Sequence, residues 1–177
     1  GVGASLMHFA GNDQESRRWT IDKIVDERSL RELELAGFEL AVREAQPWTI
    51  MSAYNRLNGT YAAENRWLLT DVLRGEWGFA GLVMTDWSAM DERVDGLIAG
   101  CDLQMPGPAD GDDARIVEAV RNGSLAERVV DVAAVRVVTL TLRGQAALRT
   151  DATFDRELSL LDDEGRGLVV YATGPGG

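Results

Sequence analysis

Several residue types that support common kinds of protein chemistry are scarce in this chain. Cys101 is its one cysteine, which excludes an intramolecular disulfide and a zinc site built from cysteines. Lys23 is its one lysine and falls in a predicted loop, so catalysis through a lysine Schiff base is not expected. His8 is its one histidine, and a lone histidine among scattered carboxylates is not a metal-binding pattern. We therefore predict neither a metal nor a cofactor.

Positive charge and long apolar runs are also scarce. The chain has 18 Lys and Arg against 29 Asp and Glu, which gives a net charge of −11. Such a surface repels the phosphates of nucleic acids and of anionic lipids, so we expect no nucleic-acid and no membrane partner. No apolar run approaches the roughly 20 residues that a membrane span needs. A neutral ligand such as a sugar is compatible with this charge.

What the chain does contain is a repeated alternation of strand and helix. With 177 residues and 45% hydrophobic content, it is long enough for one domain with a sizeable core. Apolar runs predict strands at 2–9, 49–54, 82–85 and 101–105. Amphipathic periodicity predicts helices at 30–45, 65–75, 88–100, 112–121 and 124–143. The order is typical of an α/β protein with about four parallel β/α units.

Four such units are about half of a (β/α)₈ barrel, which needs eight units and typically about 250 residues. We therefore predict a partial barrel of the TIM type over residues 1–143, followed by a linker and frayed tail over 144–177. The pairs Ser29 with Glu32, and Ser88 with Asp91, have the spacing of residues that cap helix starts. A half-barrel leaves strand edges uncovered, so self-association is expected.

Polar and aromatic residues stand where the predicted strands end. His8 and Tyr54 lie at the ends of two of these strands, and Asp86 and Trp87 directly follow a third. Because the carboxyl ends of parallel strands meet at one rim, these side chains are expected to form a pocket suited to a polyhydroxylated ligand. Taken singly, each also fits a structural role. Asp86 could cap a helix, and His8 could be a core residue with a hydrogen-bonding partner.

Five blocks of sequence resemble glycoside hydrolase family 3, the β-glucosidase family, in content, order and spacing. They are residues 7–15, 51–59, 68–79, 83–87 and 100–107. The resemblance extends to about residue 166. It implies that this chain is the second half of the family's N-terminal (β/α)₈ barrel, and that the tail leads toward a second domain outside the chain.

The resemblance also assigns roles. The Asp before Trp in the fourth block falls on Asp86 and corresponds to the nucleophile of a retaining glycosidase, which forms a covalent glycosyl-enzyme ester. The family's contacts with sugar hydroxyls correspond to His8, Arg18, Met51 and Tyr54. Trp87 corresponds to a residue that lines the same subsite. From position alone, Arg18 is equally well a solvated loop charge, and Met51 a core residue.

One departure from the family pattern concerns Met7, which stands where the family has a lysine that donates to the sugar. The family's acid/base Glu, expected in the second domain, has no counterpart by motif here. We therefore expect a fragment of a retaining β-glycosidase for terminal β-D-glucosyl residues of β-glucosides or oligosaccharides, inactive alone. The alternative is an inactive half-barrel remnant that binds sugar weakly or only associates with another chain.

Overall fold

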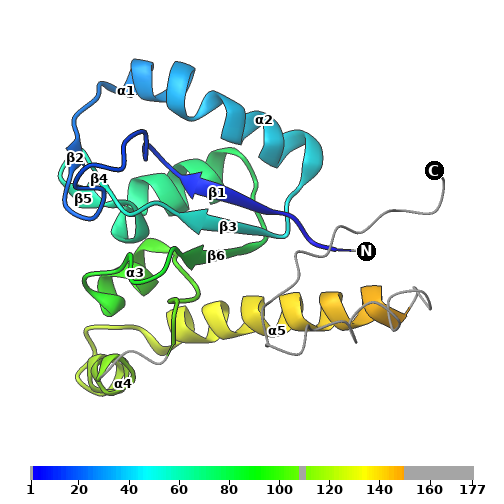
Figure 1. Cartoon of the computed structure of the whole chain (residues 1–177). Coiled ribbons are helices and arrows are strands. Elements are labelled where there is room, and N and C mark those ends of the chain that lie inside the picture. Colours follow the sequence, from blue (N-terminus) through cyan, green and yellow to red (C-terminus); the bar gives the residue numbers. More distant parts are fainter. Residues whose placement is uncertain (1, 108–110, 150–177) are drawn as a thin grey trace, which may run out of the picture.

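Three parallel strands form the centre of the molecule. A computed structural model describes residues 2–107 and 111–149. The strands are β1 (Ser5–Phe9), β3 (Thr49–Ser52) and β6 (Leu82–Thr85), hydrogen-bonded in the order β1-β3-β6. Ile50 pairs with Leu6 on one side and Val83 on the other. All three strands point the same way in Figure 1, with helices packed around them, so the predicted α/β class is confirmed.

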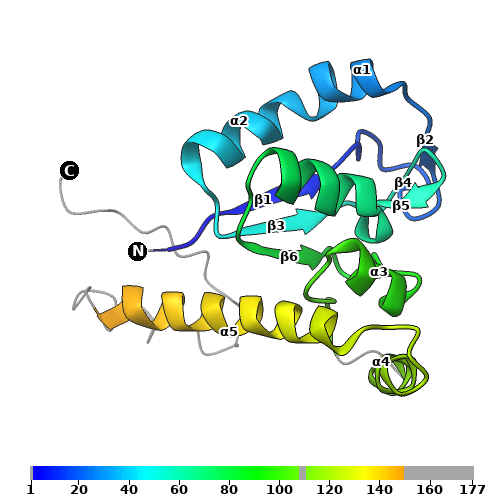
Figure 2. The ribbon, with the colours of Figure 1, turned by 180° about the vertical axis from the view of Figure 1, so that it is seen from behind.

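Helices connect successive strands. Between β1 and β3 lie α1 (Glu27–Ser29), the π-helical turn η1 (Leu30–Glu34) and α2 (Ala36–Ala45). Between β3 and β6 lie the 3₁₀ turn η2 (Ala62–Glu64) and the π-helical η3 (Trp67–Glu76). Figure 2 shows η3 in front of β1 and β3 when the molecule is seen from behind. Its buried face explains this position and consists of Leu68, Leu69, Val72 and Leu73.

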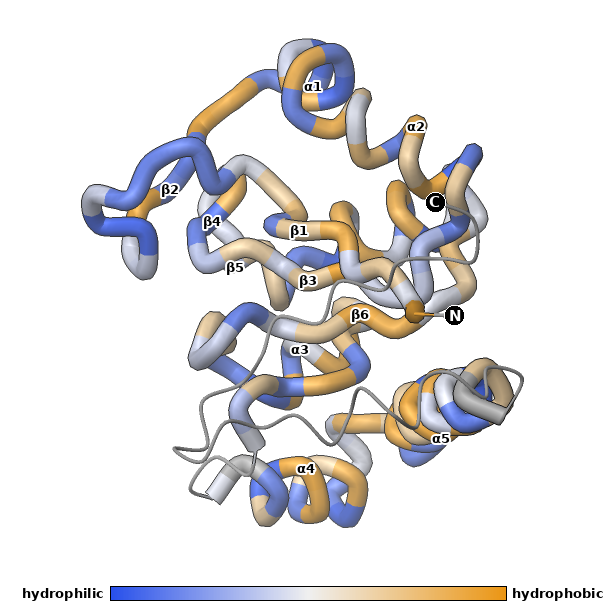
Figure 3. Tube along the Cα trace, turned by 45° about the vertical axis from the view of Figure 1, so that its right-hand side comes forward, coloured by the Kyte–Doolittle hydropathy of each residue, from blue (hydrophilic) through white to orange (hydrophobic). Residues whose placement is uncertain are grey.

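The main core lies between the sheet and these helices. Phe9 at the end of β1 meets the ring edges of Phe38 and Trp77 at centroid distances of 5.1 and 5.8 Å. Leu30, Val42 and the buried face of η3 close around these rings. In Figure 3 the strands carry much of the orange, while the loop that leads to β2 is largely blue. Burial of this apolar surface is what holds the helices on the sheet.

The predicted fourth strand at 101–105 is reduced to a single parallel bridge between Met84 and Leu103. The reason lies in Asp102, whose carboxylate accepts a hydrogen bond from the backbone N–H of Val83 at 2.9 Å. That N–H is thereby withdrawn from strand pairing. Pro106 then ends the segment, because proline has no N–H to donate.

A second, small sheet lies in regions that the sequence analysis assigned to loop and turn. It joins β2 (Asp22–Lys23), β4 (Arg56–Leu57) and β5 (Thr60–Tyr61) in the order β2-β4-β5. Asn58 and Gly59 form the turn between β4 and β5, with φ values of 50° and 92°. This sheet lies beyond the carboxyl ends of the three long strands in Figure 1.

Two helix starts differ from the predicted caps. Asp26, not Ser29, caps α1, because its carboxylate accepts a hydrogen bond from the backbone N–H of Ser29. The helix α3 (Arg93–Ala99) begins beyond both Ser88 and Asp91. Its N-cap residue is Glu92, and among the described residues no side chain caps this helix start. Gly100 ends α3 with φ 105°, and a Cβ there would lie 2.8 Å from Thr70 Oγ1.

The last two described helices pack below β6 in Figure 1. They are α4 (Asp112–Arg121) and α5 (Glu127–Arg149). A smaller core of Leu97, Ala119, Leu125 and Ala133 joins them to α3. Since α5 continues to Arg149, it passes the predicted boundary at residue 143. The remainder of the predicted linker and tail lies outside the described residues. Among the described helices, none is long and apolar enough to cross a membrane.

An ion network centred on Asp102 connects the sheet to its surrounding helices. The Asp102 side chain is 1% exposed and lies 2.7 Å from both the Arg74 and Arg136 guanidinium groups. Arg74 comes from η3 and Arg136 from α5. Arg93 of α3 donates to the backbone carbonyls of Cys101 and Asp102. Burial lowers the pKa of Arg74, and the charge of Asp102 opposes that shift.

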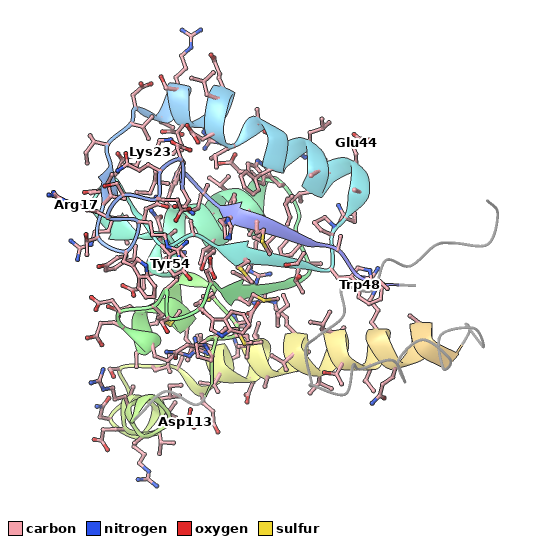
Figure 4. The ribbon with its side chains drawn as sticks, in the orientation of Figure 1. Arg17, Lys23, Glu44, Trp48, Tyr54 and Asp113 are labelled. Carbon is pink, nitrogen blue, oxygen red and sulfur yellow. The ribbon has the colours of Figure 1, made fainter. Side chains whose placement is uncertain are left out.

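Asp102→Asn is expected to lower the free energy of unfolding by about 3 kcal/mol, because it leaves the buried Arg74 charge without its counter-ion. Urea unfolding followed by circular dichroism would measure this. The control is Glu44→Gln, an exposed charge on α2 that Figure 4 labels; it is expected to change stability by less than about 0.5 kcal/mol. Equal midpoints for the two variants would show that the network contributes nothing.

Candidate active site

The candidate site lies at the carboxyl ends of β1, β3 and β6. Figure 4 shows Tyr54 at that end of the sheet and Trp48 at the opposite end. The β1 strand is irregular here, because its register with β3 shifts between Leu6 and Phe9. The peptide bonds before His8 and before Ala10 are cis. His8 therefore sits in a locally distorted strand end, beside the end of β6.

Asp86 is the first residue after β6 and faces His8. One of its carboxylate oxygens lies 3.2 Å from His8 Nε2, and the other accepts a hydrogen bond from the backbone N–H of Trp87 at 2.7 Å. The Asp86 backbone N–H donates to the carbonyl of Ser52, at the end of β3. Its side chain is 14% exposed. The carboxylate is thus fixed from two sides and still open to solvent.

Tyr54 joins the same cluster from the segment after β3. The residue is buried, and its hydroxyl lies near the Asp86 carboxylate. Burial raises the pKa of Tyr54 above its ordinary value, and the nearby Asp86 carboxylate raises it further. The phenol therefore stays protonated beside Asp86.

Arg18 reaches the site from the long loop after β1. Its guanidinium carbon lies 4.6 Å from the centre of the Tyr54 ring, and its Nη1 lies 2.9 Å from a carboxylate oxygen of Glu15. A guanidinium over an aromatic face is an attractive arrangement. The structure thus brings Arg18 together with His8, Tyr54 and Asp86, although it comes from a loop.

The remaining predicted contacts are less closely joined. Trp87 directly follows Asp86 and is half exposed. Met51 lies within β3, paired with Met84 and three residues before Tyr54. Met7, at the position of the family lysine, is 47% exposed on β1. Within residues 2–107 and 111–149, no cluster of three His, Cys, Asp or Glu side chains is arranged to hold a metal ion.

Glu64 was given no role from the sequence, yet it holds the loop that follows Asp86. One of its carboxylate oxygens accepts hydrogen bonds from the backbone N–H groups of Asp91 and Glu92, at 2.8 and 2.9 Å. These two amides lie immediately before the first residue of α3. The carboxylate comes from η2, about 27 residues earlier in the chain, so no local capping pattern could reveal it.

A family model described as the glycosyl hydrolase family 3 N-terminal domain matches residues 1–140. The chain belongs to glycosyl hydrolase family 3. Thermostable beta-glucosidase B of Acetivibrio thermocellus is 49% identical over 157 residues, which cover 89% of this chain and 21% of that protein. The exo-alpha-(1->6)-L-arabinopyranosidase of Bifidobacterium breve is 50% identical over 151 residues, covering 85% and 20%.

Solved structures of family 3 enzymes also match. The beta-glucosidase of Bifidobacterium adolescentis has a TM-score of 0.80 and 48% identity, covering 85% of this chain and 22% of that one. Beta-glucosidase 3B of Thermotoga neapolitana, solved with glucose, has a TM-score of 0.76 and 47% identity, covering 78% and 20%. The chain spans about a fifth of the length of the family 3 relatives it matches.

The Glu64 carboxylate gives a test by pH. Burial raises its pKa, although its two amide donors lower it in part. A carboxyl with a raised folded pKa contributes most to stability below its unfolded pKa, and that contribution is lost as pH rises through the folded pKa. Glu64→Gln keeps an acceptor oxygen and does not ionise. We therefore expect Glu64→Gln to become more stable relative to the unsubstituted chain as the pH rises above about 4.5, the ordinary pKa of a glutamate.

Urea titrations at several pH values would measure this gain. Glu64→Ala serves as the control. It also cannot ionise, so it is expected to show the same pH-dependent gain as Glu64→Gln, but from a level about 1 kcal/mol lower, because it has no acceptor oxygen. Parallel pH curves for the Gln variant and the unsubstituted chain would contradict the raised pKa.

Proposed function

We propose that this chain carries the nucleophile portion of a retaining β-glucosidase site, with Asp86 as the nucleophile. The observation that supports this most directly is the placement of Asp86 at a strand end, 3.2 Å from His8 and open to solvent. A retaining glycosidase needs a carboxylate that can reach the anomeric carbon of the sugar. The family's glucosidase members, and one relative named for L-arabinopyranosides, support a terminal pyranosyl residue as the substrate, with β-D-glucosyl as our proposal.

The other residues of the cluster then hold the sugar. His8 and Arg18 present nitrogen donors to its hydroxyls, while Tyr54 places a protonated hydroxyl beside Asp86. Met51 and Trp87 line the subsite with apolar surface. In the first step an Asp86 oxygen bonds to the anomeric carbon, and the leaving group departs with the electrons of the broken C–O bond. A poor leaving group also requires a proton, which we assign to an acid/base residue outside this chain.

The strand arrangement supports a partial (β/α)₈ barrel. The strands follow chain order from β1 through β3 to β6, and Leu103 continues that order beyond β6. A helix stands between each strand and the next, as in a barrel wall. In a doubly wound sheet the order would reverse at a switch point. The proposed wall contains about four β/α units, with Asp86 on its carboxyl rim.

Within the described sheet, β1 has a neighbouring strand on one side only. β1 also carries an exposed apolar residue, Met7, which is 47% exposed, whereas β3 is buried along its length. We propose that the isolated chain associates with a second copy through this open strand edge. Sedimentation as a monomer at micromolar concentration would rule this out.

The nucleophile is tested by covalent labelling with 2,4-dinitrophenyl 2-deoxy-2-fluoro-β-D-glucoside. Its leaving group departs without a proton, so the missing acid does not prevent the first step. Mass spectrometry is expected to find a single 2-deoxy-2-fluoroglucosyl group per chain, attached to Asp86. Asp86→Asn is expected to lose the label, and Asp71→Asn, an exposed carboxylate on η3, to keep it.

Label on another residue, or its persistence in Asp86→Asn, would overturn the assignment. Absence of label together with measurable glucose binding would favour the alternative, a half-barrel remnant that binds sugar without chemistry.

The departure at Met7 gives a gain-of-function test. Met7→Lys is expected to add a charge-assisted hydrogen bond to the sugar, and such bonds contribute about 1.5–3 kcal/mol. Because the position is half exposed, we expect the lower end, about a ten-fold faster labelling of Asp86. The control is Met7→Leu, which keeps the size and adds no donor. A Lys variant no faster than the Leu variant would refute this role for position 7.

A further inference from the structure

A hollow of about 270 Å³ lies beside the proposed sugar site, and none of the roles discussed so far uses it. Tyr54 belongs to both, because it lines the hollow while its hydroxyl lies near the Asp86 carboxylate. The hollow therefore begins one side chain away from the proposed nucleophile. Its walls come from the loop before β2, from β5 and from the loop after Asp86: Trp19, Thr20, Tyr54, Tyr61, Ser88, Ala89, Met90 and Asp91.

Trp19 is the most unusual of these residues. It is 48% exposed, yet its ring is stacked on Tyr54 at a centroid distance of 4.7 Å and an angle of 26°. The Arg18 guanidinium carbon lies 5.9 Å from the indole and 4.6 Å from the Tyr54 ring. The indole is thus fixed by two neighbours while much of its apolar surface stays open. A side chain already held in place loses little rotamer freedom when a ligand packs on it.

The opposite walls are fixed as well. Tyr61 carries the Arg56 guanidinium 4.4 Å from its ring centre, and Glu64 holds the backbone of Asp91. Ala89 is buried, and Met90 packs against the main core. The hollow is consequently a rigid aromatic slot, with hydroxyl and carboxylate groups of Thr20, Ser88 and Asp91 at its margin.

We propose that this slot binds an aromatic leaving group, so that β-glucosides of phenols are the preferred substrates. The proposal rests on the proposed function. A planar ring stacks on Trp19, and hydroxyl substituents on that ring find partners in Thr20, Ser88 or Asp91. A second sugar could also place a C–H face on the indole, but it carries more hydroxyl groups than a phenol, and the hollow is lined by only a few polar side chains that could bind them.

Two labelling reagents separate the slot from the sugar site. The dinitrophenyl 2-deoxy-2-fluoro-β-D-glucoside and 2-deoxy-2-fluoro-β-D-glucosyl fluoride place the same sugar on Asp86, but only the first has an aromatic leaving group. Trp19→Ala is expected to lower the ratio of the aryl rate to the fluoride rate about five-fold. Trp19→Phe should restore most of that ratio. Ile24→Ala, an exposed apolar residue after β2, is the matched control and should leave the ratio unchanged.

A ratio that stays the same in Trp19→Ala would overturn the proposal, including the case in which both rates fall together. That case would mean that Trp19 acts only by supporting Tyr54.

A binding measurement keeps the slot testable even if Asp86 takes no label. The indole N–H signal of Trp19 can be assigned in a ¹⁵N spectrum by its loss in Trp19→Phe. We expect phenyl β-D-glucoside to shift this signal, and methyl β-D-glucoside at the same concentration to shift it much less. Such a shift without any label would remove the proposed nucleophile but keep the slot. Equal shifts, or none, would overturn the slot itself.

Discussion

The buried carboxylate of Asp102 is the interaction on which the arrangement of this chain depends. It binds the Val83 amide of β6, Arg74 of η3 and Arg136 of α5, so one residue fixes a strand between two helices. Since Asp86 follows directly after β6, its position depends on how firmly β6 is held. A buried charge shared by two cations and an amide has few alternative partners, which makes the arrangement specific.

The local sequence pattern was sufficient to predict strands and helices whose residues carry the whole signal themselves. The strand Leu82–Thr85 and the helix Asp112–Arg121 appear where the sequence predicted them. The fourth strand was overestimated, because an apolar run cannot show that the Asp102 side chain takes the amide needed for pairing. The small sheet of β2, β4 and β5 was missed for a related reason. Two-residue strands have no periodicity, and this sheet exists through contacts distant in the chain.

In the candidate site too, residues placed by local pattern were predicted, and contacts between distant segments were not. His8, Tyr54 and Asp86 were expected to meet because strand-end logic applies to each of them. Arg18 could be placed only by resemblance to a family, since nothing in its loop marks it as facing Tyr54. Trp19 and Glu64 were not anticipated. The stacking of Trp19 on Tyr54 and the binding of the Asp91 amide by Glu64 are pairings between separate loops.

The loop that carries Arg18 is anchored at several points. Asn58 binds both the N–H and the carbonyl of Val25, Asp22 accepts from the N–H of Gly59, and Lys23 pairs with Asp13 and Glu34. The conformational entropy of this segment is therefore lost when the protein folds, before any ligand arrives. The surface beside Tyr54 is therefore preorganised. A molecule that binds there does not have to order this loop, so most of its interaction energy contributes to affinity.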